Sequence, residues 1–378
     1  MDDILILLGI TLLSALIFFP SLPDFAERFT IPKDAILSLM SVLSVFTIYS
    51  KRKKVILPLL IPVSIYLGLC LLSFKNALSW FLVFRSISFD LMGFSFFWFT
   101  VNAVRREQVE KILWILLGVV SVSAAISFSG LDLRTPWSST FGNPEYGAGL
   151  WVMGLAVSVG LFRSAWLVSA LLAVMLILAE ARSAALGLLV GVAAVFSLRE
   201  FRKQIVAVST ICLLIVALMA MASVIRYLGP QWFDIDIADR AHIYSASIQY
   251  MAEYPWFGVG RGNFQLHSYS FVYNYGGALL AQKLYFSYLH NDYLQLWLEA
   301  GPMALGIWLF ILWRILWPLP REWLGAGLFI GLAAELIRAL FLFPFQLGPD
   351  VAYFWIIAGL YWVVKNERHS DRPLSLST

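Results

Sequence analysis

Charged residues are scarce in this chain, and their scarcity excludes most kinds of soluble protein. Only 13% of the 378 residues are Asp, Glu, Lys or Arg, whereas 60% are apolar and the mean hydropathy is +0.80. Soluble domains carry about a quarter of their residues as charges. The composition therefore predicts an integral membrane protein that binds the lipid bilayer, and no nucleic acid is expected among its partners.

Cysteine is also rare, and this argues against a disulfide framework or a thiolate metal site. Cys70 and Cys212 both lie in apolar runs, where a thiol behaves as a small hydrophobic side chain. The first residues lack a basic segment and a small-residue cleavage site, so the apolar run 3–19 is expected to be a retained first span.

Apolar runs long enough to cross a bilayer recur along the whole chain. They predict an all-α, polytopic membrane protein with about twelve transmembrane helices, in one transmembrane domain over 1–378. The expected spans are 3–19, 34–50, 55–73, 81–101, 110–128, 146–162, 164–179, 183–198, 204–222, 292–313, 322–342 and 350–364. Basic clusters such as 51–54, 105–106 and 199–203 fall on alternate loops, which predicts cytoplasmic termini by the positive-inside rule.

One predicted outer loop, residues 223–290 between spans nine and ten, is longer and more polar than the others. It contains a predicted helix from Asp239 to Met251, with apolar residues at helical spacing, and a glycine-rich run at 258–263. The glycines do not precede a strand and helix, so a tight turn is favoured over a nucleotide site. A helical cap over the bundle is expected here.

His290 stands where this loop enters a membrane helix, and it is the main catalytic candidate. Asp292 is the expected N-cap, with Gln295 completing a capping box, and Asn291 lies between His290 and Asp292. The positive end of the helix favours a bound anion and a neutral imidazole. A neutral imidazole can serve as a general base. The alternative is a histidine that only borders the helix and contacts headgroups.

Three arginines are candidates for binding a diphosphate, because a guanidinium offers a planar, permanently charged fork. Arg182 begins a span, Arg240 follows Asp239, and Arg261 lies in the glycine turn. The alternative for Arg182 is an ion pair with Glu180 or a headgroup contact, and for Arg240 it is a local pair with Asp239. For Arg261 the alternative is simple exposure to solvent.

Other polar residues give weaker signals. Arg85, Lys283 and Asp350 are outer charges of secondary interest, and Glu335 and Arg338 are expected to neutralise each other within the bundle. A weak carboxylate pair, Asp234 and Asp236, most simply stays solvated, so no metal and no cofactor are expected. The remaining histidines, His242, His267 and His369, are expected to be solvated.

Four segments together resemble the O-antigen ligase and O-antigen polymerase superfamily of bacterial membrane glycosyltransferases. They are 139–144 (STFGNP), 180–184 (EARSA), 239–240 with 255–260 (DR and PWFGVG), and 290–295 with 299–301 (HNDYLQ and EAG). Glu145 departs from the asparagine that often follows the first segment. The resemblance implies a GT-C-like fold in the bacterial inner membrane, with the active site facing the periplasm.

The resemblance also implies the reaction. A glycan would move from a polyprenyl diphosphate carrier to an acceptor hydroxyl, with inversion and without a metal. The family's histidine maps onto His290, and its arginines map onto Arg182 and Arg240, with Arg261 placed less securely. The acceptor would be lipid A-core in a ligase or a carrier-linked glycan in a polymerase.

A lipid or glycan transporter is the alternative from another functional class, since many spans with buried arginines also suit alternating access. Transporter sites gather near the membrane midplane, whereas the polar candidates here gather toward the outer face. The sequence therefore favours the enzyme.

Overall fold

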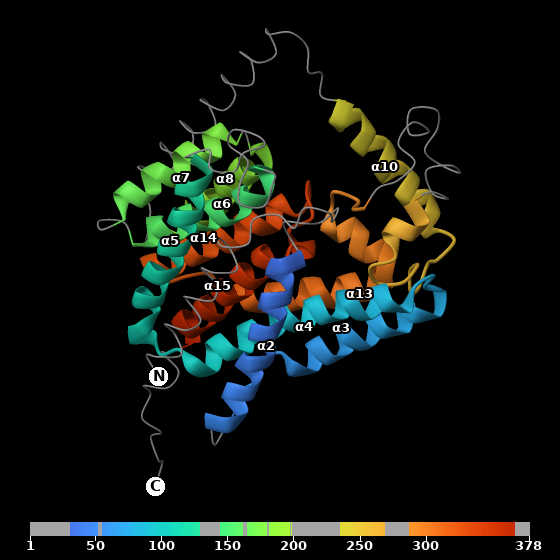
Figure 1. The fold of residues 1–378 in the computed structure, drawn as a ribbon, viewed down its shortest axis with the longest axis horizontal. Helices are drawn as coiled ribbons and strands as arrows, with labels where there is room; N and C mark the ends of the chain where they lie inside the picture. The colour runs from blue at the N-terminus through green and yellow to red at the C-terminus, as the bar shows by residue number, and fades with distance from the viewer. Residues whose placement is uncertain are drawn as a thin grey trace.

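A computed structural model describes residues 31–51, 55–128, 144–161, 165–179, 181–196, 198, 235–268 and 287–366. Every regular element in these ranges is helical (Figure 1). The elements are α2 (Ile31–Lys51), α3 (Leu60–Leu72), η1 (Ser73–Asn76), α4 (Trp80–Ala103), α5 (Arg106–Phe128), α6 (Pro144–Gly160), α7 (Trp166–Leu178), α8 (Arg182–Phe196), α10 (Ile235–Met251), α13 (Asp292–Leu316), α14 (Trp323–Arg338), η3 (Pro344–Gln346) and α15 (Gly348–Asn366).

The all-α prediction is confirmed for these residues, and most predicted spans coincide with a helix to within a few residues. Four helical stretches are long and apolar enough to cross a membrane, namely 33–50 of α2, α4, α5 and α13. The helices are those expected of a multi-pass membrane protein. The predicted spans 3–19 and 204–222 lie outside the described residues, so the number twelve stays a prediction.

Small residues let α14 pack closely against two neighbours. The backbones of Gly160 in α6 and Gly327 in α14 touch, and Gly187 of α8 lies directly on the carbonyl of Ala334. Such small-residue contacts allow membrane helices to approach without a hydrophobic driving force. Helices α6 and α8 pack on α14, and α5 and α7 pack on α6, while α3, α4 and α13 lie together in another part of the bundle (Figure 1).

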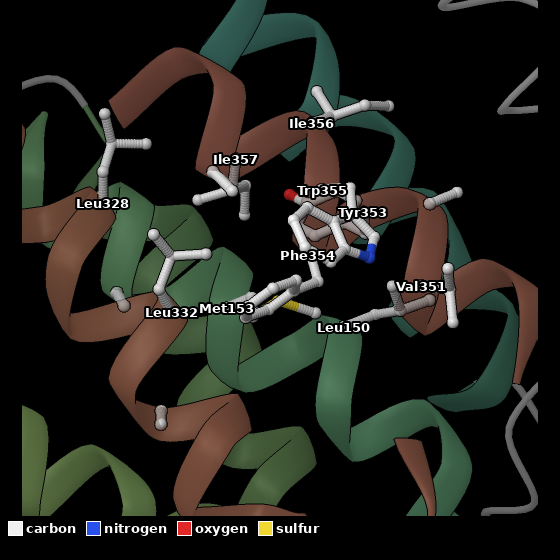
Figure 2. Packing of buried hydrophobic residues seen from close by; sticks show 14 of the residues in the cluster. Leu150, Met153, Leu328, Leu332, Val351, Tyr353, Phe354, Trp355, Ile356 and Ile357 are labelled. Atoms are coloured by element: carbon white, nitrogen blue, oxygen red, sulfur yellow. The ribbon is translucent and has the colours of Figure 1, made fainter. Parts of the chain in front are cut away.

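The centre of the bundle is filled by interdigitating apolar side chains from α6, α14 and α15. Figure 2 shows Met153 of α6, Leu332 of α14 and Phe354 of α15 converging in this core. Trp355, also buried, packs against the backbone of Gly93 in α4. The core thus fixes the helices around which the site is assembled.

The same contacts fix the direction of each helix. Gly187 and Gly191 of α8 meet Ala334 and Ile330 of α14, so these helices are antiparallel. By similar contacts, α6 is antiparallel to α14, while α4 and α13 run parallel to α15. Five helices therefore begin at one end of the bundle. We call this the loop end, and their first residues are Trp80, Pro144, Arg182, Asp292 and Gly348.

Exposed tryptophans and basic residues are arranged along the bundle axis as in membrane proteins. Trp80 and Trp256 are exposed at the loop end, and Trp313 and Trp317 are exposed at the opposite end. Tryptophans favour the two membrane interfaces. The opposite end of the described bundle carries the basic residues Arg105, Arg106, Arg314, Arg321 and Lys365. Which membrane face this end occupies stays a prediction.

The loop that carries α10 is joined to a break in α13. Gly301 has a positive φ of 84°, and the next residue, Pro302, has no backbone N–H to donate to the carbonyl of Leu298. The N–H groups of Val259 and Gly260 donate instead to the carbonyls of Leu298 and Glu299, both at 2.9 Å. The loop backbone therefore completes the hydrogen bonding of the broken helix.

Candidate active site

His290 lies in a strained backbone position immediately before α13. Its φ is 57°, which is uncommon for a residue other than glycine. Asn291, not Asp292, is the N-cap: its side chain accepts a hydrogen bond from the N–H of Leu294 at 3.0 Å. The predicted cap is thus wrong by one residue, because Asp292 is already the first helical residue. The predicted position of the helix start beside His290 is confirmed.

The two residues predicted to form a capping box have other partners. The buried carboxylate of Asp292 accepts from the N–H of Phe345 at 2.9 Å and from the amide of Gln346 at 3.2 Å. Gln295 accepts from the N–H of Leu289 at 3.0 Å. Asp292 therefore ties α13 to the segment between α14 and α15, and Gln295 holds the chain just before His290.

The imidazole of His290 is half-buried against aromatic rings. It packs edge-on against Phe343, with ring centroids 5.0 Å apart. Tyr288 stacks on the same Phe343 ring, with centroids 4.2 Å apart. The His290 carbonyl accepts a hydrogen bond from the hydroxyl of Tyr244 at 2.8 Å. Backbone and ring are thus both held, which is the preorganisation that a general base requires.

Helix α10 brings Arg240 to the same region. Arg240 and Tyr244 are four residues apart and so share one face of α10. The Arg240 guanidinium donates to the carbonyl of Phe341 at 2.9 Å, two residues before the Phe343 that contacts His290. The structure therefore brings Arg240 and His290 together. The predicted helix is confirmed, although it begins at Ile235 rather than Asp239, and its buried residues pack on the loop and on α13.

Arg182 is exposed and is the first residue of α8. The antiparallel contacts of α8 with α14 place it at the level of the last turn of α14, near Ala339. Ala339 in turn accepts a hydrogen bond from the N–H of Asp292 at 2.9 Å. Arg182 therefore lies at the loop end with His290, but on a different helix.

Arg261 is enclosed rather than exposed, with only 3% of its surface accessible. Its guanidinium forms ion pairs with Glu299 at 2.7 Å and with Asp90 of α4 at 3.3 Å. Burial alone would lower the pKa of Arg261, but Asp90 and Glu299 raise it well above its ordinary value. Two carboxylates thus hold the fork that was expected to face a diphosphate. This arrangement favours a structural role, and donor contact by Arg261 stays a prediction.

A second buried network holds Arg338. It pairs with Glu335 at 2.6 Å, as the sequence predicts, and also with Asp350 at 3.3 Å. Its guanidinium further donates to the carbonyl of Glu145 in the first turn of α6. Asp350 was expected to be an outer charge, but it is 2% exposed and joins α15 to α14. The network locks three helices together at the loop end.

Of the remaining residues singled out in the sequence, the structure describes the side chains of Arg85 and His267 but not those of the others. Arg85 lines a pocket together with Tyr288, near the His290 ring cluster. Lys283, Asp234 and His369, and the side chains of Asp236 and His242, lie outside the described residues. In the described part of the chain no group of three or more His, Cys, Asp or Glu side chains could hold a metal ion.

His267 was expected to be solvated, but it is only 6% exposed. Its Nδ1 lies 2.8 Å from the hydroxyl of Tyr250, and its ring packs beside Tyr254. Sequence periodicity could not find this contact, because His267 and Tyr250 lie on opposite sides of the Gly258–Gly262 turn. Burial lowers the pKa of His267 below its ordinary 6.5.

This lowered pKa predicts a pH-dependent stability. The unfolded chain binds a proton near pH 6.5 and the folded one only at lower pH, so the stabilisation is complete above 6.5 and is lost as pH falls through the folded pKa. We expect the melting temperature of the purified protein to fall between pH 7 and pH 5. His267→Gln should flatten this dependence. An unchanged slope in that variant would exclude His267 as the titrating group.

The chain was compared with known protein families and with curated proteins. Residues 167–309 match the family model described as O-antigen ligase, and no curated protein matches the chain. The matched stretch begins in α7 and ends within α13, so it includes Arg182, Arg240, Arg261 and His290. The resemblance found in the sequence is thereby confirmed over these residues. Residues 167–309 therefore form an O-antigen ligase domain, which indicates an enzyme of the glycosyltransferase type.

Proposed function

We propose that the protein transfers a glycan from a polyprenyl diphosphate carrier to an acceptor hydroxyl at the loop end, on the periplasmic face. The observation that carries the proposal is the anchoring of Arg240 and His290 on the same short segment, through Phe341 and Phe343. A permanent cation and the proposed base therefore contact the same short segment. Ligation to lipid A-core is the reaction we favour, and polymerisation would use the same donor chemistry.

In the proposed reaction His290 takes the proton of the acceptor hydroxyl. The freed oxygen forms a bond to the anomeric carbon while the bond from that carbon to the diphosphate oxygen breaks. The diphosphate leaves with the electron pair, and attack from the opposite side inverts the configuration. Arg240 and Arg182 stabilise the charge that develops on the leaving group. This chemistry needs no metal from the protein.

The helix ends support the arginines as anion ligands. The first turns of α6, α13 and α15 each carry a carboxylate, namely Glu145, Asp292 and Asp350, and these complement the helix dipoles. Helix α8, like α4, has no acid in its first turn, and it begins with Arg182. Arg182 thus stands exposed at the positive end of α8, a position that favours a bound anion.

A charge prediction follows for Arg240. Arg240→Ala should lower kcat/KM for the donor by about 10²- to 10³-fold, the usual effect of removing one stabilising donor. Arg240→Lys should retain more activity, since it keeps a positive charge without the fork. Arg105→Ala, at the opposite end and exposed, is the matched control. Equal activity of the alanine and wild-type enzymes would argue against diphosphate contact.

Reconstitution tests the function as a whole. The purified protein is placed in liposomes with a carrier-linked glycan and either lipid A-core or a second carrier-linked glycan, with and without EDTA. We expect modified lipid A-core and no effect of EDTA. Extension of the carrier-linked glycan would instead identify a polymerase. A loss of activity with EDTA that added metal restores would contradict the metal-independent mechanism, and transport without transfer would contradict the enzyme.

A further inference from the structure

A partly open pocket lies between α4, the glycine turn and the segment before His290. Its wall carries the side chains of Arg85, Ser86, Gln265, Tyr288, Gln295 and Gln346. Amide groups, hydroxyls, one guanidinium and the aromatic rings of Tyr288 and Phe89 therefore line a common space. Only one of these side chains is charged, so the wall is polar without being strongly cationic.

This set of groups matches a sugar ring. Planar amides and guanidinium groups can bond two neighbouring hydroxyls at once, as donors or acceptors. An aromatic ring offers an apolar face to the C–H face of a pyranose, and its hydroxyl offers a polar handle. A diphosphate would need several cations, and the pocket supplies only Arg85. The wall chemistry therefore fits a carbohydrate better than it fits a diphosphate.

The pocket walls are held rigidly. Gln295 is fixed by the N–H of Leu289 and by Glu299 at 3.0 Å, and Gln346 is fixed by Asp292. Gly262 has a positive φ of 74°, and a Cβ there would collide with Ser86 and with the carbonyl of Leu82. Glycine is thus required for the turn to lie this close to α4. Such preorganisation lowers the entropic cost of binding a ligand.

The position of the pocket relative to His290 indicates which sugar it would take. Along the segment after α14, Phe341 meets Arg240, the Phe343 ring meets His290, and Gln346 lines the pocket. His290 therefore lies between Arg240 and the pocket along this segment. In an inverting displacement the nucleophile and the leaving group lie on opposite sides of the anomeric carbon. With the donor diphosphate bound at Arg240, the pocket is on the acceptor side of the anomeric carbon.

We propose that this pocket binds a sugar ring of the acceptor, which makes it an acceptor subsite. The assignment of the sugar to the acceptor rests on the proposed function, whereas sugar binding by the pocket can be tested without it. Arg85 and Gln265 are then specificity-determining residues that contact substrate without taking part in the chemistry.

A binding experiment tests the sugar site independently of catalysis. Saturation-transfer NMR is recorded on the full chain in detergent with methyl glucoside, methyl galactoside or glucuronic acid, without donor. We expect signal transfer to ring protons of at least one sugar, reduced about 10-fold in apparent affinity by Gln265→Ala or Arg85→Ala. Gln249→Ala, on an exposed face of α10, and His290→Asn should bind as the wild type does. No transfer to any sugar, or equal transfer in all variants, overturns the site.

A kinetic experiment tests the acceptor assignment. Gln265→Ala and Arg85→Ala should raise the KM for acceptor about 10-fold and leave the KM for donor unchanged. A raised KM for donor instead would assign the pocket to the donor glycan and overturn the acceptor subsite. If the sugars bind but neither the wild-type protein nor any variant transfers glycan, the proposed function fails while the carbohydrate site stands.

Discussion

Replacing His290 by alanine is expected to reduce glycan transfer by about 10²- to 10⁴-fold, the range for removing a general base. The loss should fall mainly on kcat, because the arginines and the pocket still bind both substrates. The fold should persist, since the contacts that fix this segment use the backbone of His290 and the side chains of its neighbours. Transfer rates in liposomes and melting temperature measure the two effects separately.

His290→Asn is the sharper variant. Asparagine tolerates the positive φ found here and approximates the size of the ring, but it cannot act as a base near neutral pH. It should therefore fold as well as the wild type and still be inactive. Wild-type transfer by the asparagine variant would remove His290 from the mechanism.

Arg261→Ala is expected to have the largest effect on stability. It leaves Asp90 and Glu299 without the cation that lies between them, and breaking a buried pair in this way costs about 3–5 kcal/mol. The loop should detach from α4 and α13, so Arg240 and Tyr244 would no longer be held beside His290. We expect a lower melting temperature, faster proteolysis between 252 and 263, and loss of transfer.

A compensated variant separates structure from donor contact. Arg261→Met combined with Asp90→Asn and Glu299→Gln removes the charges together, and neutral replacement of a buried ionic group is often well tolerated. Stability should return. If Arg261 only positions the loop, activity should return as well; if stability returns and transfer stays lost, Arg261 contacts the donor. If Arg261→Ala alone is as stable as the wild type, the structural role of Arg261 is contradicted.

The sequence predicted well those features that depend on local pattern. Apolar run length predicted the helices, and the change from polar loop to apolar helix predicted the helix start beside His290. Features that depend on contacts between distant segments were not predicted. The partners of Arg261 come from α4 and α13, 171 and 38 residues away. Nothing in the local sequence distinguishes such a buried arginine from one that faces a ligand.

Burial explains the other differences. Asp292 and Asp350 look like ordinary first-turn acids, yet each also accepts or pairs with a group from another helix. His267 looks like a loop histidine, but the glycine turn folds it back under Tyr250. In each case the residue type was informative about the local helix or turn, while its partner was set by how distant segments pack.

The break in α13 makes the loop and the helix interdependent in any chimera between relatives. The carbonyls of Leu298 and Glu299 receive their hydrogen bonds from Val259 and Gly260, so neither segment is complete without the other. Exchanging the loop between relatives without the matching Gly301–Pro302 region would leave unsatisfied backbone groups in apolar surroundings, each costly there. The loop and the first half of α13 should therefore be inherited, grafted or deleted only as one unit.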